Sequence, residues 1–238
     1  DSDPDMRRSL FAFFVVSGFC SLVYEVVWIR LAMASFGVTT SFVSIVLSVF
    51  MGGLALGSFA AGRLARRTEG RPPSHDLRLY ALAEAVVGVS GILVPWALAR
   101  GREMLERWQG DSVWSNSRYL LASGAWIALV LLPACVCMGA TYPLAMAAIR
   151  KIRGPETSFS RLYVANVVGA TTGSLASAFV LVEWLGFRGT LRFAAGGNAA
   201  LVIGAFVLAA KGADGIALPR AASSDVNVAG ARPDRSLL

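Results

Sequence analysis

The chain alternates long apolar stretches with short polar connections. Several of the apolar stretches reach the roughly 20 residues that a helix needs to cross the hydrocarbon core of a bilayer. The second and fourth stretches contain no charged residue. The pattern predicts an all-α, polytopic membrane protein with six transmembrane helices, over residues 9–33, 41–62, 79–99, 119–149, 162–182 and 193–210.

This pattern divides the chain into three parts. Residues 1–8 form a short N-terminal segment, and residues 9–210 form the transmembrane domain. Residues 211–238 are rich in Gly, Ala, Ser, Asp and Pro, so we expect a disordered tail. The fourth helix is longer than one crossing requires and contains Pro133 and Pro143, so we expect it to tilt, kink or extend beyond the bilayer.

The amino-acid composition also indicates a membrane protein. Only 16% of the 238 residues are charged and 55% are hydrophobic, whereas a soluble domain carries about 25% charged residues. The net charge of +7 could indicate nucleic-acid binding, but the basic residues do not cluster with aromatic residues in a soluble module. We therefore expect the lipid bilayer, and no nucleic acid, as a partner.

The basic residues instead predict an orientation. Fifteen of the 22 Lys and Arg residues fall in the termini and in the second and fourth connections, and seven fall on the other side. By the positive-inside rule we expect both termini to be cytoplasmic. On the outer side, residues 101–118 are expected to form either a solvated loop or a short interfacial helix with Trp108 and Trp114 at headgroup depth.

Small residues recur every four positions on two of the predicted helices. Such strips let another helix backbone approach closely, which is how helices associate in lipid. We therefore predict helix packing at two sets of residues: Gly53, Gly57 and Ala61 in the second helix, and Ala165, Gly169, Gly173 and Ser177 in the fifth.

Polar residues follow one face of the first helix. Ser17, Ser21 and Glu25 recur at steps of four, with Tyr24 and Trp28 beside them. A carboxylate facing lipid is costly, so this face should point into the bundle. Glu25 could then pair with an arginine of another helix, such as Arg188 or Arg192, or bind a cation or a proton; Arg30 is poorly placed to pair with it along the same helix. These five residues, together with Asn166, are the predicted substrate-binding set.

Other polar positions have simpler interpretations. Glu84 and Glu183 lie near the predicted ends of their helices, where a carboxylate can reach headgroups or a basic partner. Asn166 can alternatively form an interhelical hydrogen bond. The single histidine, His75, follows two prolines in a connection and is expected to be a solvated loop residue.

The sequence contains no recognisable catalytic motif. Cys20, Cys135 and Cys137 lie in apolar stretches and are expected to be small buried hydrophobes rather than metal ligands or disulfide partners. No phosphate-binding loop, zinc cluster or hydrolase elbow is present. We expect no metal, no cofactor and no catalytic residues in this chain, and whether it is an enzyme stays open.

Two resemblances sharpen these expectations. The connection Gly62-Arg-Leu-Ala-Arg-Arg-Thr-Glu-Gly-Arg71 resembles the gating loop between the second and third helices of major facilitator transporters, at the positions Gly62, Arg66, Arg67, Gly70 and Arg71. Arg66 stands where that family has Asp, and the second glycine is displaced to Gly70. The resemblance implies that the bundle is similar to half of a major facilitator fold.

The closer resemblance covers nearly the whole membrane region. SGFCSLVYEVVWIRL, SVFMGGLALGS, MGATYPLA, LYVANVVGATTGSLASAFVL and GFRGTL are similar to segments of bacterial proteins that fuse a major-facilitator-like membrane part to a spermidine-synthase-like part. The soluble part of those proteins has no counterpart here, so we expect it either on another chain or in a longer form of this one.

The resemblance leads to two main hypotheses. The chain is a membrane module that binds or transports a small organic cation such as a polyamine, or it is a non-transporting scaffold or accessory subunit that anchors a synthase-like enzyme or a larger complex. Because a major facilitator has twelve helices, transport by six implies a homodimer or a separate partner chain. An enzyme acting through Glu25 is a third hypothesis, for which no second catalytic group is found.

Overall fold

The structure is a computed structural model that describes residues 4–110, 115–153 and 159–215. Within these ranges the chain is helical, with no strand. The elements are α1 (Pro4–Phe36), α2 (Thr40–Arg67), α3 (Pro73–Gln109), α4 (Asn116–Arg153), α5 (Phe159–Ala176), the π-helical segment η1 (Ser177–Leu181) and α6 (Val182–Gly215). The all-α prediction is confirmed.

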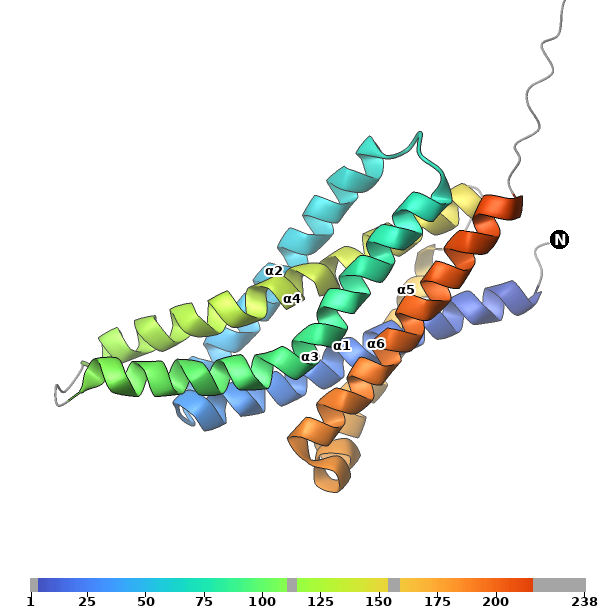
Figure 1. The fold of residues 1–238 in the computed structure, drawn as a ribbon. Coiled ribbons are helices and arrows are strands. Elements are labelled where there is room, and N and C mark those ends of the chain that lie inside the picture. The colour runs from blue at the N-terminus through green and yellow to red at the C-terminus, as the bar shows by residue number, and fades with distance from the viewer. Residues whose placement is uncertain (1–3, 111–114, 154–158, 216–238) are drawn as a thin grey trace, which may run out of the picture.

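Five helical runs among the described residues are long and apolar enough to cross a membrane, as expected of a membrane protein. The predicted fifth and sixth helices belong to a single run, Phe159–Ala210, of 52 residues. Only Gly186 leaves the helical conformation within it, with φ 66° and ψ 177°. Figure 1 shows the chain reversing direction at this point, at the lower end of the orange ribbon.

The helices are also longer than the hydropathy pattern predicts. α1 begins at Pro4 rather than at Ser9, and α6 continues to Gly215. The first residues of the predicted tail, 211–215, are therefore helical, and the rest of that tail, from residue 216 onward, lies outside the described residues, as does Trp114. These extensions arise because polar residues at a helix end interrupt the apolar pattern without breaking the helix.

The outer connection is the clearest such case. α3 continues without a break to Gln109, so the predicted interfacial helix or loop over residues 101–109 is wrong. This part of α3 packs against the start of α4, and the Trp126 indole N–H donates to the Ala97 carbonyl oxygen at 3.0 Å. Gly101 leaves the space that the Trp126 ring occupies. The two helices therefore project together as a pair, at the left of Figure 1.

The helices pack through their small residues. α2 lies along α4 and α1 along α5, while α3 contacts both α4 and α6. Gly53 and Gly57 of α2 lie against the α4 backbone at Cys135 and Val136, and Gly169 and Gly173 of α5 lie against the α1 backbone. Ala61, Ala165 and Ser177 are also buried. A side chain in place of any of the four glycines would hold the backbones apart.

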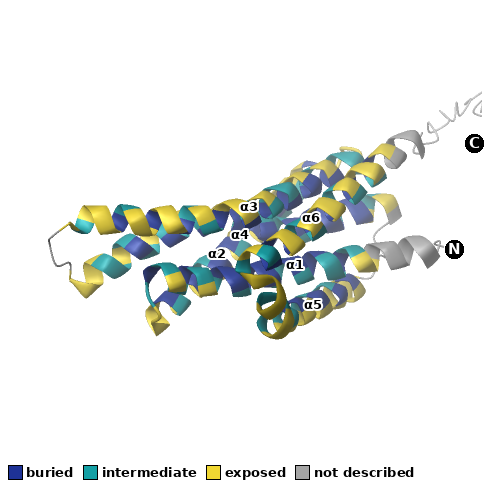
Figure 2. Cartoon of the chain, turned by 60° about the horizontal axis from the view of Figure 1, so that its bottom comes forward, coloured by how far each residue is buried: buried dark blue, intermediate teal, exposed yellow. Residues whose placement is uncertain are grey.

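The interior is aromatic and the outside is apolar. Trp28, Tyr24, Phe42 and Phe50 are among the largest fully buried side chains. Large apolar side chains are also exposed over the outward faces of the helices, including Met51, Phe59, Ile92, Leu129 and Phe179. Figure 2 shows buried positions between the helices and exposed ones facing outward. An apolar outer surface of this kind suits lipid rather than water.

We expect Gly57→Ala to destabilise the protein, because its new Cβ would overlap the Val136 carbonyl oxygen of α4. Overpacking of this kind costs about 1–3 kcal/mol. Gly52→Ala, in the same helix, is the matched control because a Cβ there meets no atom within 4 Å. The measurement is the midpoint of thermal unfolding in one detergent, and equal midpoints for the two variants would contradict this packing.

Candidate functional site

Glu25 is a buried carboxylate near the middle of the bundle. It lies on α1 and is 6% exposed. Its carboxyl group faces α4, where it interacts electrostatically with Cys135. Within the described part of the chain no hydrogen bond or ion pair joins Glu25 to another residue, and this includes Arg30, Arg188 and Arg192.

Two aromatic side chains lie beside Glu25 on α1. Tyr24 and Trp28 are both 0% exposed, and their rings stack at a centroid distance of 5.2 Å and an angle of 26°. The Trp28 indole N–H is buried and has no acceptor among the described residues. A buried donor without a partner costs about 1–3 kcal/mol, so this group also needs an external partner such as water. Tyr24, Glu25 and Trp28 are named the α1 site below.

A second buried carboxylate, Glu84 of α3, lies nearby. It is 1% exposed. Ser17 Oγ of α1 donates to Glu84 Oε1 at 2.8 Å, and Asn198 Nδ2 of α6 donates to Glu84 Oε2 at 2.6 Å. The Tyr24 hydroxyl donates in turn to Asn198 Oδ1 at 3.1 Å. Tyr24 therefore belongs to both the α1 site and this Glu84 cluster.

The expectation that Glu84 reaches headgroups or a basic partner is wrong. It rested on a helix beginning at Leu79, whereas α3 begins at Pro73 and places Glu84 three turns inside. Asn198 was not identified from the sequence at all. The available signal was a single amide in an otherwise apolar stretch, which indicates a polar partner on another helix.

The remaining predicted binding residues lie elsewhere. The Ser21 hydroxyl donates to the Ser17 carbonyl oxygen of its own helix at 2.9 Å. Asn166 Nδ2 donates to the Phe14 carbonyl oxygen at 3.5 Å, a long hydrogen bond between α5 and α1. The structure thus stacks Tyr24 on Trp28 next to Glu25 in the chain, assigns Ser17 to the Glu84 cluster, and places Asn166 at the contact between α5 and α1.

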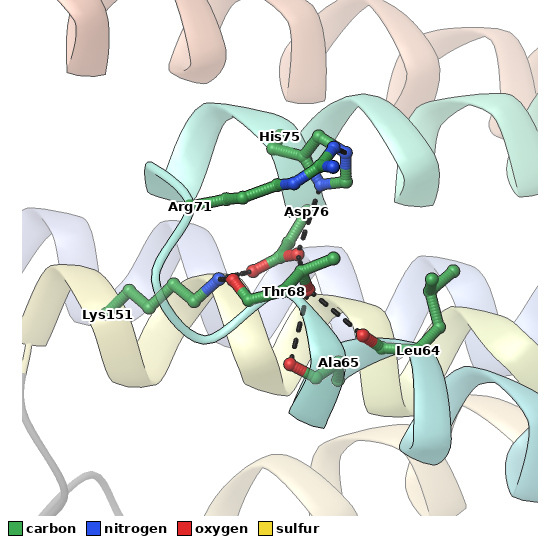
Figure 3. Close-up of polar contacts among 7 residues, drawn as sticks. All are labelled: Leu64, Ala65, Thr68, Arg71, His75, Asp76 and Lys151. Atoms are coloured by element: carbon green, nitrogen blue, oxygen red, sulfur yellow. Dashed lines mark hydrogen bonds and ion pairs between the residues drawn. The ribbon is translucent and has the colours of Figure 1, made fainter.

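A third polar cluster joins the turn between α2 and α3 to the end of α4 (Figure 3). Asp76 is 0% exposed, and its Oδ2 lies 2.6 Å from Lys151 Nζ. Thr68 Oγ1 donates to Asp76 Oδ1 at 3.1 Å, and Lys151 Nζ donates to the Thr68 carbonyl oxygen at 2.6 Å. These contacts tie three helices together at the end of the bundle where α1 begins.

The residues predicted to form a gating loop lie around this cluster. Gly62, Arg66 and Arg67 are in the last turns of α2, and both arginines are exposed. Gly70 is exposed in the turn. Arg71 Nη1 lies 2.9 Å from His75 Nε2, and His75 Nδ1 lies 3.6 Å from Asp76 Oδ1.

His75 is therefore a half-buried residue in the first turn of α3, not a solvated loop residue. Asp76 and Lys151 were not identified from the sequence, because the ion pair joins residues 75 positions apart. Over the described ranges, no three His, Cys, Asp or Glu side chains gather in a way that could hold a metal ion.

The fold and its buried polar clusters are those of a polytopic helical membrane protein. Over 216 residues the chain is 34% identical to polyamine aminopropyltransferase 2 of Streptomyces coelicolor, and the alignment covers 84% of this chain. The chain spans only 36% of the length of that protein. No family model matches the chain. No solved structure matches it.

We expect Lys151→Met to destabilise the protein by about 3 kcal/mol or more, because it leaves the buried Asp76 carboxylate unpaired. Arg102→Met is the matched control. It breaks an ion pair between Arg102 and Glu106, whose side chains are 56% and 60% exposed, so we expect no measurable loss of stability. Chemical unfolding in mild detergent measures both.

A double variant sharpens this comparison. Combining Lys151→Met with Asp76→Asn removes the unpaired charge. The double variant should therefore lose less free energy of unfolding than the two single variants lose in sum. Strict additivity would show that Lys151 and Asp76 do not interact energetically.

Proposed function

We propose that this chain is an integral membrane module of the fused major-facilitator and spermidine-synthase-like proteins, in the bacterial inner membrane. In this proposal it binds or transports a small organic cation, such as a polyamine, at the α1 site. The likeness to polyamine aminopropyltransferase 2 supports the family and the class of ligand. The buried Glu25 carboxylate, unpaired among the described residues, is the observation that carries the binding role.

The chemistry of the α1 site suits an ammonium group. A buried carboxylate forms a short, charge-assisted hydrogen bond to an ammonium, and the site is otherwise apolar. The stacked rings of Tyr24 and Trp28 provide aromatic faces that attract a cation. The Trp28 indole N–H needs an acceptor, which a water molecule hydrating the cation provides. An anion is disfavoured because Glu25 would repel it.

We also propose six membrane crossings, arranged as in half of a major facilitator, with both termini cytoplasmic. A continuous helix of 52 residues would be about 78 Å long, against a hydrocarbon core of roughly 30 Å. The break at Gly186 and the packing of both α5 and α6 against α1 support two crossings in this run. The excess of basic residues near the termini supports the orientation.

A scaffold role is the second candidate. It is favoured by the extent of the likeness, since 64% of the length of the similar aminopropyltransferase lies outside what this chain spans. In that case the module would hold a synthase-like enzyme, on the same or another chain, at the membrane. Glu25 would then have a structural role only.

We expect Glu25→Gln to weaken spermidine binding by about 10- to 100-fold, because a charge-assisted hydrogen bond contributes about 1.5–3 kcal/mol. Calorimetric titration of the protein in lipid nanodiscs measures the affinity. The matched control is Glu183→Gln, which neutralises an exposed carboxylate at the start of α6 and should leave the affinity unchanged.

Uptake into proteoliposomes then separates binding from transport. Spermidine uptake that Glu25→Gln abolishes supports a transporter, whereas spermidine binding without uptake supports a binding module. The cation-binding role fails if the wild-type protein does not bind spermidine, and the scaffold then becomes the better hypothesis.

The six-crossing arrangement predicts which positions are accessible from each side. In a variant lacking the three native cysteines, Arg188→Cys should react with a membrane-impermeant maleimide from outside spheroplasts. Glu69→Cys should react only after the membrane is opened. Both positions are exposed in the structure. Labelling of both from the same side would exclude six crossings.

A further inference from the structure

The Glu84 cluster contains an acidic group without a counter-charge. Glu84 is 1% exposed, and its two carboxyl oxygens accept hydrogen bonds from Ser17 and Asn198, which are both neutral. Ser17 and Asn198 are themselves 6% and 2% exposed. The α1 site does not use this carboxyl group as a ligand, so the cation-binding proposal leaves Glu84 without a role.

The side chains that face Glu84 come from three helices. α1 contributes Cys20 and Tyr24 as titratable groups, α3 contributes Tyr80, and α6 contributes the amide of Asn198. Within the described part of the chain, no Arg, Lys or His takes part in this cluster. A negative charge on Glu84 is therefore stabilised only by neutral hydrogen-bond donors.

Two opposing effects act on this carboxyl group. Burial in an apolar bundle strongly disfavours an isolated anion, and a group in that position takes up a proton instead. Donors directed at both oxygens favour the anion. A carboxyl group held between these two effects can exist in both forms, and the change from one to the other requires only that a proton leaves or enters.

Tyr24 connects this group to the α1 site. Its hydroxyl donates to Asn198, which donates to Glu84, while its ring stacks on Trp28 beside Glu25. The ring also fills the space left by Gly91 of α3. A cation bound at the α1 site therefore adds positive charge next to the residue that ends the hydrogen-bond chain to Glu84.

We infer that Glu84 is a proton-binding site, and that it releases its proton when a cation binds at the α1 site. In this step the carboxyl O–H bond breaks, the electron pair stays on the carboxylate, and the proton passes to water. The positive charge of the one ammonium group bound at the α1 site is then offset by the proton that leaves. The coupling rests on the proposed cation binding, whereas protonation of Glu84 does not.

Infrared spectroscopy of the full chain in nanodiscs tests the proton site. Near neutral pH, where exposed carboxyl groups are ionised, the wild-type protein should show a protonated-carboxyl C=O band that disappears as the pH is raised further. Glu84→Gln should remove a component of this band that Glu25→Gln and Glu183→Gln both retain. A band that is unchanged in Glu84→Gln, or no such band near neutral pH, would overturn the assignment.

A second variant keeps the test valid if Glu84→Gln does not fold. Ser17→Ala retains the carboxyl group but removes one donor to its anionic form. Because a hydrogen bond to a charged group contributes about 1.5–3 kcal/mol, the band should persist to a pH about one to two units higher. An unchanged or lowered midpoint would contradict the role of Ser17 and the proton site with it.

Proton release tests the coupling. Adding spermidine to the wild-type protein in weak buffer should release about one proton for each cation bound, measured with a pH indicator and compared with calorimetric binding. Glu84→Gln should still bind spermidine but release no proton. Equal proton release by the wild type and by Glu84→Gln would overturn the coupling. A wild-type protein that binds no spermidine would overturn the proposed function. In that case the infrared experiment still decides whether Glu84 is a proton-binding site.

Discussion

The position of α1 depends on the close approach of its backbone to α5. Lipid supplies no hydrophobic force to drive helices together, so the contact relies on van der Waals packing. Gly169 and Gly173 of α5 meet the α1 backbone at Val15 and Phe19, and Gly18 of α1 meets Asn166. With one side of α1 held in this way, its other faces turn toward α3, α4 and α6. Ser17, Tyr24 and Glu25 thereby enter the interior.

Two carboxylates in the same bundle have different surroundings, and this difference separates their chemistry. Glu84 accepts hydrogen bonds from donors on two other helices, whereas Glu25 has no such partner in the described residues. A group already surrounded by donors can hold a charge or a proton without a ligand. A buried group without donors either takes up a proton or needs an external counter-charge. The Tyr24 hydroxyl donates to Asn198, which in turn donates to Glu84, so Tyr24 joins the Glu84 cluster from α1.

The polar cluster at the end where α1 begins serves a different purpose. Asp76 has a cationic partner, Lys151, and the two are shielded from solvent. Their contacts connect the α2–α3 turn to the end of α4, so a relative movement of these helices would have to break a buried ion pair. The exposed arginines of the same turn make no comparable contact, apart from Arg71 beside His75. The polar group that ties the helices here is Asp76, rather than the arginines noted from the sequence.

The hydropathy pattern alone determined that this chain is helical and suited to a membrane, because each helix satisfies its backbone hydrogen bonds within itself and so leaves a local signal. It also located Tyr24, Glu25 and Trp28 on one stretch of helix. It did not reveal that Glu84 is buried among hydrogen-bond donors, because its partners Ser17 and Asn198 lie 67 and 114 positions away in the chain. It also did not reveal the ion pair between Lys151 and Asp76. Which side chains meet depends on how far each helix extends and how it is rotated against its neighbours. Only the tertiary structure decided that, through the close contacts that the glycines permit.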